Sequence, residues 1–242
     1  MTFAHRFGFP FNQKPQTLNP MKTTPILLVA LHIGLTCAQA TPPTNLDLLP
    51  TGAIQLQGGS ADECQIRPGL VDLSTGKWRG MGMTSKIKPD SGTELSTNIT
   101  LKREDSPEFD YTLVAKIAGN RVSASGAWKS EGSLPGFGRL DFWVPESMAS
   151  DLTLECNGKE FCRNFKQVTQ GTRFPAAASI VARRTSSGEF LFQIDNATNA
   201  SINIIEGQEA QGLTIRIAPG PTVDCQIGDT PEISWEIDFE KK

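Results

Sequence analysis

From residue 52 onward the chain consists of short runs in which apolar and polar residues alternate, and this period of two limits the fold more than any other feature. Alternating side chains line the two faces of an extended strand, and no run keeps the 3.6-residue period of a helix. The pattern predicts an all-β fold, an immunoglobulin-like or jelly-roll β-sandwich stapled by disulfides, rather than a βαβ fold. The expected strands cover residues 53–57, 95–101, 111–117, 122–128, 138–144, 151–156, 178–183, 189–194, 201–205, 213–218 and 233–239.

The segments between these runs are rich in Gly, Pro, Asn, Asp and Ser, which favour turns. Gly119-Asn120 predicts a hairpin, and Asn157-Gly158 predicts a tight turn. We expect an extended Pro-rich segment over 41–50, and either a short helix or a long loop over 157–176. A single domain is expected over 41–242, with any subdivision near 157–176. Further turns are expected at 89–92, 135–136, 186–188, 195–196 and 219–221.

Residues 21–40 contain the three parts of a secretory signal peptide. Lys22 supplies the positive charge, residues 25–36 form an apolar stretch, and Ala38 and Ala40 are the small residues that a signal peptidase requires. The stretch is shorter than the roughly 20 residues that a transmembrane helix needs. We therefore expect export to the periplasm, the cell surface or the medium, and a mature chain from residue 41 without a transmembrane segment.

We expect translation to start at Met21, so that residues 1–20 result from a start site assigned too far upstream. The short form of the signal is typical of bacteria. Cys37 raises the alternative of a lipid anchor, but Gly34 stands three residues before it, where a lipoprotein signal has a large aliphatic residue.

The charge of the mature chain argues against nucleic acid and anionic membranes as partners. The whole chain has 23 Lys and Arg against 26 Asp and Glu. Residues 1–40 hold three of the cations and none of the acids, so the mature chain has a net charge of −6. Phosphate groups would repel a chain of that sign.

Both histidines, His5 and His32, precede residue 41, so the mature chain has none. This excludes Ser-His-Asp and Cys-His catalysis and histidine zinc sites. An enzyme would have to use carboxylates, as glycosidases do. Glu236 and Asp238 form such a pair on the last strand, although acids spaced in this way are usually a solvated surface. We expect no catalysis, no cofactor and no metal.

Four cysteines follow residue 40, and an even number in an exported chain predicts disulfides. The turn between Cys156 and Cys162 favours a local bridge, which leaves Cys64 to pair with Cys225. This second bridge would close most of the mature chain, a constraint worth about 4–5 kcal/mol by loop entropy. The alternative is a zinc site of all four cysteines, but the paired C-x2-C spacing is missing.

The expected strand 138–144 places Arg139, Asp141 and Trp143 on one face and its apolar residues on the other. Trp143 then lies on the polar face between a cation and a carboxylate, where it can stack on a sugar ring or on a partner side chain. Trp78 is a second candidate binding residue. For both, the alternative is packing under a neighbouring loop. Two further tryptophans align with apolar neighbours and are expected in the core: Trp128 and Trp235.

Two end segments resemble strands of chaperone–usher fimbrial subunits. Residues 52–58 (GAIQLQG), followed by Cys64, are similar to the first strand of that family, and residues 233–239 (ISWEIDF) resemble its alternating last strand, which a periplasmic chaperone grips. The resemblance implies an incomplete immunoglobulin-like sandwich that the next subunit completes. The chain departs from the family by lacking a cysteine at the family's spacing after Cys64 and by lacking the penultimate aromatic residue.

We therefore expect an exported, non-catalytic binding or interaction protein of the bacterial envelope or cell surface, with a protein or carbohydrate partner. The alternative is a fimbrial or pilus subunit assembled by donor-strand exchange, and the second alternative is a carboxylate-dependent, glycan-active enzyme. A stable purified monomer would separate the first function from the second. Turnover of a polysaccharide would identify the third.

Overall fold

The computed structural model describes residues 39–74, 82–83, 86–102, 107–130, 132, 134–162, 172–174, 178–207, 212–219 and 226–240. Trp78, Cys225 and all but the last two residues of the expected signal peptide lie outside this part of the chain. The described residues belong to one compact unit. None of the helices among them is long and apolar enough to span a bilayer.

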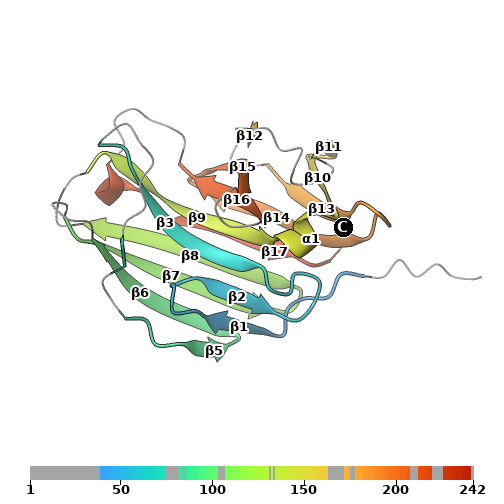
Figure 1. Ribbon diagram of the computed structural model, residues 1–242, viewed down its shortest axis with the longest axis horizontal. Helices are drawn as coiled ribbons and strands as arrows, with labels where there is room; N and C mark the ends of the chain where they lie inside the picture. Colours follow the sequence, from blue (N-terminus) through green and yellow to red (C-terminus); the bar gives the residue numbers. More distant parts are fainter. Residues whose placement is uncertain are drawn as a thin grey trace, which may run out of the picture. The chain divides into compact units, whose positions relative to one another are not determined.

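Strands make up most of the described chain, as the alternation predicts, and every pair of neighbouring strands is antiparallel (Figure 1). The helical elements are short: α1 (Glu146–Ala149) and the 3-10 turn η2 (Ile227–Asp229). One sheet, called sheet A here, has the order β12 (Thr172–Phe174), β15 (Ser201–Gly207), β16 (Gly212–Ala218), β9 (Gly136–Pro145), β3 (Gln65–Asp72), β2 (Ile54–Gln57), β1 (Asn45–Leu48), β5 (Asp90–Gly92). The other, sheet B, has the order β11 (Lys159–Cys162), β10 (Leu152–Cys156), β13 (Ile180–Arg184), β14 (Phe190–Thr198), β17 (Ile233–Asp238), β8 (Arg121–Ser130), β7 (Phe109–Ala118), β6 (Glu94–Lys102), β4 (Gly82–Met83).

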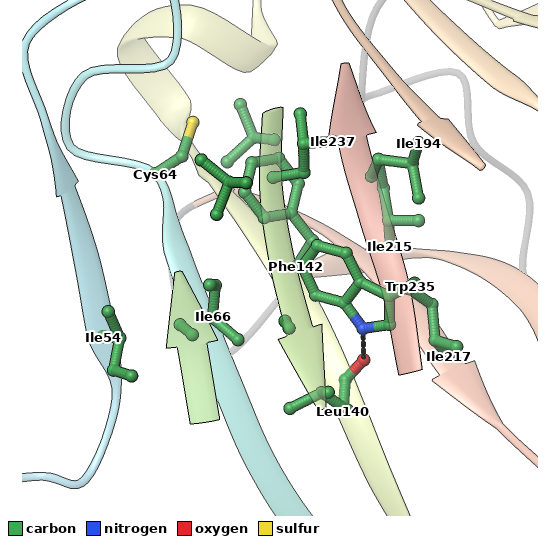
Figure 2. Packing of buried hydrophobic residues seen from close by; sticks show 14 of the residues in the cluster. Ile54, Cys64, Ile66, Leu140, Phe142, Ile194, Ile215, Ile217, Trp235 and Ile237 are labelled. Atoms are coloured by element: carbon green, nitrogen blue, oxygen red, sulfur yellow. Dashed lines mark hydrogen bonds between the residues drawn. The ribbon is translucent and has the colours of Figure 1, made fainter. Parts of the chain in front are cut away.

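The two sheets share a core in which β9 of sheet A meets β17 of sheet B. Figure 2 shows the contact: the indole Nε1 of Trp235 donates a hydrogen bond of 3.1 Å to the carbonyl oxygen of Leu140. Phe142 packs edge-on against Phe192 at 5.3 Å and against Trp235 at 5.8 Å between ring centroids. Trp128 is also buried, so both tryptophans expected in the core are there. These contacts fix β9 from its inner side.

All eleven expected runs overlap strands, and the strands that the alternation missed have identifiable causes. β1 is only four residues long and follows two prolines, so its alternation of apolar and polar residues is too short to predict a strand. In β3, Pro68 and Gly69 interrupt the alternation of the sequence but not the strand. β5 consists of turn residues, Asp90 to Gly92, yet it pairs with β1. In the stretch 157–176, the described residues form the strands β11 and β12 rather than a helix.

Both two-residue turns predicted from glycine and asparagine are present. Gly119, with φ 60°, and Asn120 join β7 to β8. Asn157 and Gly158, with φ 48° and 79°, join β10 to β11, as a type I′ turn requires. The expected turn at Asp195 and Asn196 is wrong: Asn196 has φ 55° within β14, where the register with β17 shifts, so the residue forms a bulge.

The local disulfide expected across the β10–β11 hairpin is not formed, because Cys156 is a free, buried thiol. The register pairs Cys156 with Lys159, whereas Cys162 pairs with Leu154. Diagonal partners in a hairpin lie about 7–8 Å apart, whereas bridged Cβ atoms are about 4 Å apart. The turn was therefore predicted correctly and the bridge was not.

The expected Cys64–Cys225 bridge is not formed in this structure, and Cys225 lies outside the described residues. Cys64 is a free, buried thiol, with its Sγ 3.7 Å from the Sδ of Met148.

Candidate functional site: the outer face of sheet A

The alternation of β9 separates the core of the molecule from a polar outer surface. The inward residues Leu140 and Phe142 are fully buried between the sheets. Arg139, Asp141 and Trp143 lie on the other side of the strand. Asp141 is buried there, whereas Arg139 and Trp143 are half-buried. The prediction that these three residues share one face is confirmed, and β9 holds them rigidly because sheet A extends on both sides of it.

Asp141 is the centre of a cluster of ion pairs. Its Oδ2 lies 3.2 Å from Nη1 of Arg139 and 3.7 Å from Nε of Arg216, which belongs to the neighbouring strand β16. The Asp141 side chain is only 5% exposed. The carboxylate is therefore held by guanidinium groups and is not presented to solvent beside Trp143.

Arg67 of β3 stacks on Trp143. Its guanidinium carbon lies 3.9 Å from the ring centroid, and its Nε donates a hydrogen bond of 2.9 Å to Oε1 of Gln65. A cation–π contact of this kind stabilises by about 0.5–1 kcal/mol at exposed sites and more when it is desolvated. A side chain of the same sheet therefore covers part of the indole.

We call Arg67, Arg139, Asp141, Trp143 and Arg216 the arginine face. Its three guanidinium groups and one carboxylate leave an excess of two positive charges. Burial lowers the pKa of Arg67 and of Arg216, and the Asp141 carboxylate opposes this shift in both. Arginine stays protonated in proteins, so the direction of the shift shows guanidinium groups that have lost water.

Two glycines leave the space that the large side chains of the arginine face occupy. Gly69 of β3 pairs with Arg139, and a Cβ at Gly69 would lie 2.6 Å from Nε of Arg139. A Cβ at Gly212, the first residue of β16, would lie 2.8 Å from Nε1 of Trp143. Contacts this close do not occur, so any other residue at either position would displace these side chains.

A hollow of about 400 Å³ adjoins the arginine face on the side of β3 and β2. Arg67 belongs to both, and Gln65 of the hollow accepts its hydrogen bond, so the hollow and the arginine face form a continuous surface. The remaining residues of its lining are apolar or small: Leu49, Thr51, Ala53 and Pro68.

The carboxylate pair of the last strand lies on the outer face of sheet B and is bound to a cation. Oε2 of Glu236 lies 3.4 Å from Nη1 of Arg121, and Oδ2 of Asp238 lies 3.3 Å from Nη2 of Arg121. Glu236 also accepts a hydrogen bond of 2.8 Å from Asn196. The Asp238 side chain is only 4% exposed and the Glu236 side chain 34%, so of the pair only Glu236 has the contact with solvent expected from the sequence.

A second hollow, of about 320 Å³, lies next to this pair on sheet B. Small hydroxyl residues leave the space, including Ser123, Ser125 and Ser234. Its one aromatic residue, Trp235, is only 1% exposed and so offers no ring to a ligand. The sheet A surface therefore presents positive charge and an aromatic ring, whereas the sheet B hollow presents hydroxyl groups with the Asn196 amide and the Glu236 carboxylate.

The alternation found Arg139, Asp141 and Trp143 but missed Arg67 and Arg216. Those two arginines join the site only through the pairing of β3 and β16 with β9, and one sequence does not reveal which strands are neighbours. Trp78 lies outside the described residues. Among the described residues, no group of three or more His, Cys, Asp or Glu side chains gathers in a way that could hold a metal ion.

Neither the known protein-family models nor the curated proteins contain a match to this chain. The arginine face must therefore be interpreted from its own geometry and chemistry.

Proposed function

We propose that this chain is a non-catalytic, glycan-binding protein whose ligand lies on the arginine face and in the adjoining hollow. The observation that carries the proposal is the half-buried Trp143, stacked by Arg67 on a face of β9 that the core does not use. A tryptophan side chain has a large apolar ring system and a polar N–H, and it supplies a large contact area at a low entropic cost. Amide and guanidinium donors beside a ring suit the hydroxyl groups and C–H faces of sugars.

The polar groups of the arginine face favour a role beyond stability. In the described part of the chain, Nε of Arg139, Nε1 of Trp143 and Oδ1 of Asp141 are buried without a hydrogen-bond partner. A buried polar atom left unpaired costs about 1–3 kcal/mol. Apolar residues on this face would avoid that cost. Places where a protein leaves buried polar groups without hydrogen bonds are commonly functional sites.

A catalytic role finds less support. Glu236 and Asp238, the carboxylates that an enzyme would use, share Arg121 as an ion-pair partner. Asp141 has two arginines as partners. A general acid or nucleophile has to reach the scissile bond, and carboxylates held in this way face guanidinium groups instead.

Assembly by donor-strand exchange also finds less support. That mechanism needs an open groove in an incomplete sheet. The two strands that resemble the fimbrial family are both internal: β2 lies between β1 and β3, and β17 lies between β14 and β8. A stable, reversibly melting monomer is the result that favours the glycan-binding protein.

We further infer that the two sheets form a β-sandwich larger than an immunoglobulin domain. An immunoglobulin domain has about seven to nine strands, and the described sheets here contain eight and nine. The signal peptide motif of residues 21–40 supports export, so we place the binding protein in the periplasm, on the cell surface or outside the cell.

Trp143→Ala tests the proposed function. A panel of neutral and acidic oligosaccharides would first identify a binder, and the dissociation constant would then be measured for each variant. We expect Trp143→Ala to weaken binding at least about tenfold, which corresponds to 1.4 kcal/mol, with little change in melting temperature. The control is Ser123→Tyr, which fills the sheet B hollow and should leave binding intact.

Three results would contradict the proposal. No oligosaccharide binds, or Ser123→Tyr abolishes binding while Trp143→Ala retains it, or Trp143→Ala unfolds the chain. The last would show that Trp143 serves the core.

A further inference from the structure

We infer that the glycan bound at the arginine face is acidic, with a carboxylate or sulfate group on the sugar that occupies the hollow beside Arg67. The inference rests on the proposed function and adds the chemical class of the ligand. It depends on which guanidinium nitrogens are already engaged.

The two terminal guanidinium nitrogens of Arg67 are available to bind an oxyanion. Its Nε is engaged by Oε1 of Gln65, and its ring contact is with Trp143. Neither terminal nitrogen of Arg67 has a partner in the part of the chain that the structure describes. Those two nitrogens form a planar fork, which matches two oxygens of a carboxylate or a sulfate in a bidentate pair.

The position of Arg67 gives the acidic group a definite place. Arg67 lines both the arginine face and the hollow of about 400 Å³. A volume of this size, at the lower end of ordinary small-molecule sites, admits a sugar ring. The Gln65 amide and the Thr51 hydroxyl at the same hollow can meet the hydroxyl groups of that ring.

The local charge explains why an acidic sugar is favoured in a chain that is negative overall. The arginine face has an excess of two positive charges, whereas the whole chain has a net charge of −3. At physiological ionic strength, charges more than about 8 Å away are largely screened. A short acidic oligosaccharide therefore meets mainly the arginines, whereas a long polyphosphate extends over the acidic remainder of the surface.

Two matched pairs of probes test the inference by titration calorimetry. The first pair is a short oligogalacturonate and its methyl ester, which differ in the charge of each carboxyl group and by one methyl group on it. The second is a sulfated and an unsulfated dextran oligomer. We expect an acidic probe to bind at least about tenfold more tightly than its neutral counterpart, because a hydrogen bond to a charged group is worth that much.

Arg67→Gln should remove this preference, and Arg183→Gln is the matched control. Arg183 also has its Nε engaged by a neighbouring side chain, 3.2 Å from Oε1 of Glu155, and its guanidinium lies over Phe190 at 5.8 Å, but it belongs to sheet B. We expect Arg67→Gln to weaken binding of the acidic probe about tenfold more than binding of the neutral one, so that the preference for the acidic probe disappears. Arg183→Gln should bind both as the unmodified chain does.

The outcomes separate this inference from the proposed function. Equal binding of charged and neutral probes, or an unchanged preference in Arg67→Gln, overturns the acidic-ligand inference and leaves glycan binding standing. Failure of every glycan overturns both. Equally tight binding of polyglutamate or of a DNA oligonucleotide would also overturn the inference, because the site would then select charge alone.

Discussion

At the scale of single residues, the arginine face depends on what stands opposite each large side chain. Arg139 extends over Gly69, and Trp143 lies over Gly212, because neither glycine has a Cβ in the way. The sequence shows that Arg139 and Trp143 alternate away from the core, so part of the site could be predicted. It does not show that Arg67 pairs across the ladder with Asp141, since register is a property of two strands.

Two buried neutral groups should make the protein sensitive to alkali. Burial raises the pKa of the Cys64 thiol and of the Tyr111 hydroxyl, so the folded chain keeps protons that the unfolded chain releases. The free energy of unfolding should be insensitive to these groups below about pH 8 and should fall above pH 9–10, by about 1.4 kcal/mol per pH unit for each group that has ionised in the unfolded chain.

Urea unfolding between pH 8 and pH 11 measures this dependence. Tyr111→Phe should flatten the part of the curve above about pH 10, and Cys64→Ala should flatten the part that begins lower. A free energy of unfolding in Tyr111→Phe that falls with pH as steeply as that of the unmodified chain would show that Tyr111 ionises without cost in the folded state.

At the scale of secondary structure, the elements that could be predicted are those whose residues carry their own pattern. The hairpin β7–β8 needs only alternation and a glycine in the turn, both of which stand in the sequence. β5 could not be predicted, because Asp90, Ser91 and Gly92 favour a turn and become a strand only by pairing with β1. The expected disulfides failed for a similar reason: spacing along the chain does not fix distance across the sheets.

Gly119→Ala tests the role of backbone conformation in the β7–β8 turn. Gly119 has φ 60°, and nothing lies within 4 Å of where its Cβ would be, so the substitution adds strain without a clash. We expect a loss of about 1 kcal/mol in the free energy of unfolding, because L-residues avoid this conformation. The control is Gly92→Ala, whose Cβ would meet only ordinary contacts at 3.7 Å and whose φ is not positive.

Chemical denaturation would give both values. Gly92→Ala should lie within about 0.5 kcal/mol of the unmodified chain. If Gly119→Ala were no less stable than Gly92→Ala, the turn would have to adopt another conformation in solution.

At the scale of the whole molecule, β9 connects stability and function. Its inner side joins the two sheets through Phe142 and through the hydrogen bond from Trp235 to Leu140, and its outer side carries the arginine face. A site on a strand that is fixed in this way is preorganised, which limits the entropy lost on binding. Ligand binding should accordingly change the surroundings of Trp143 without altering the core.

The indole N–H signals of the four tryptophans, followed by NMR during titration with the tightest-binding oligosaccharide, test the central claim most directly. Each signal would be assigned by single substitution to phenylalanine. We expect the Trp143 signal to shift and saturate with ligand, while the signals of Trp128 and Trp235, both buried, stay in place. A ligand that binds fully while the Trp143 signal does not move would contradict the account, because the binding surface would then lie away from the arginine face.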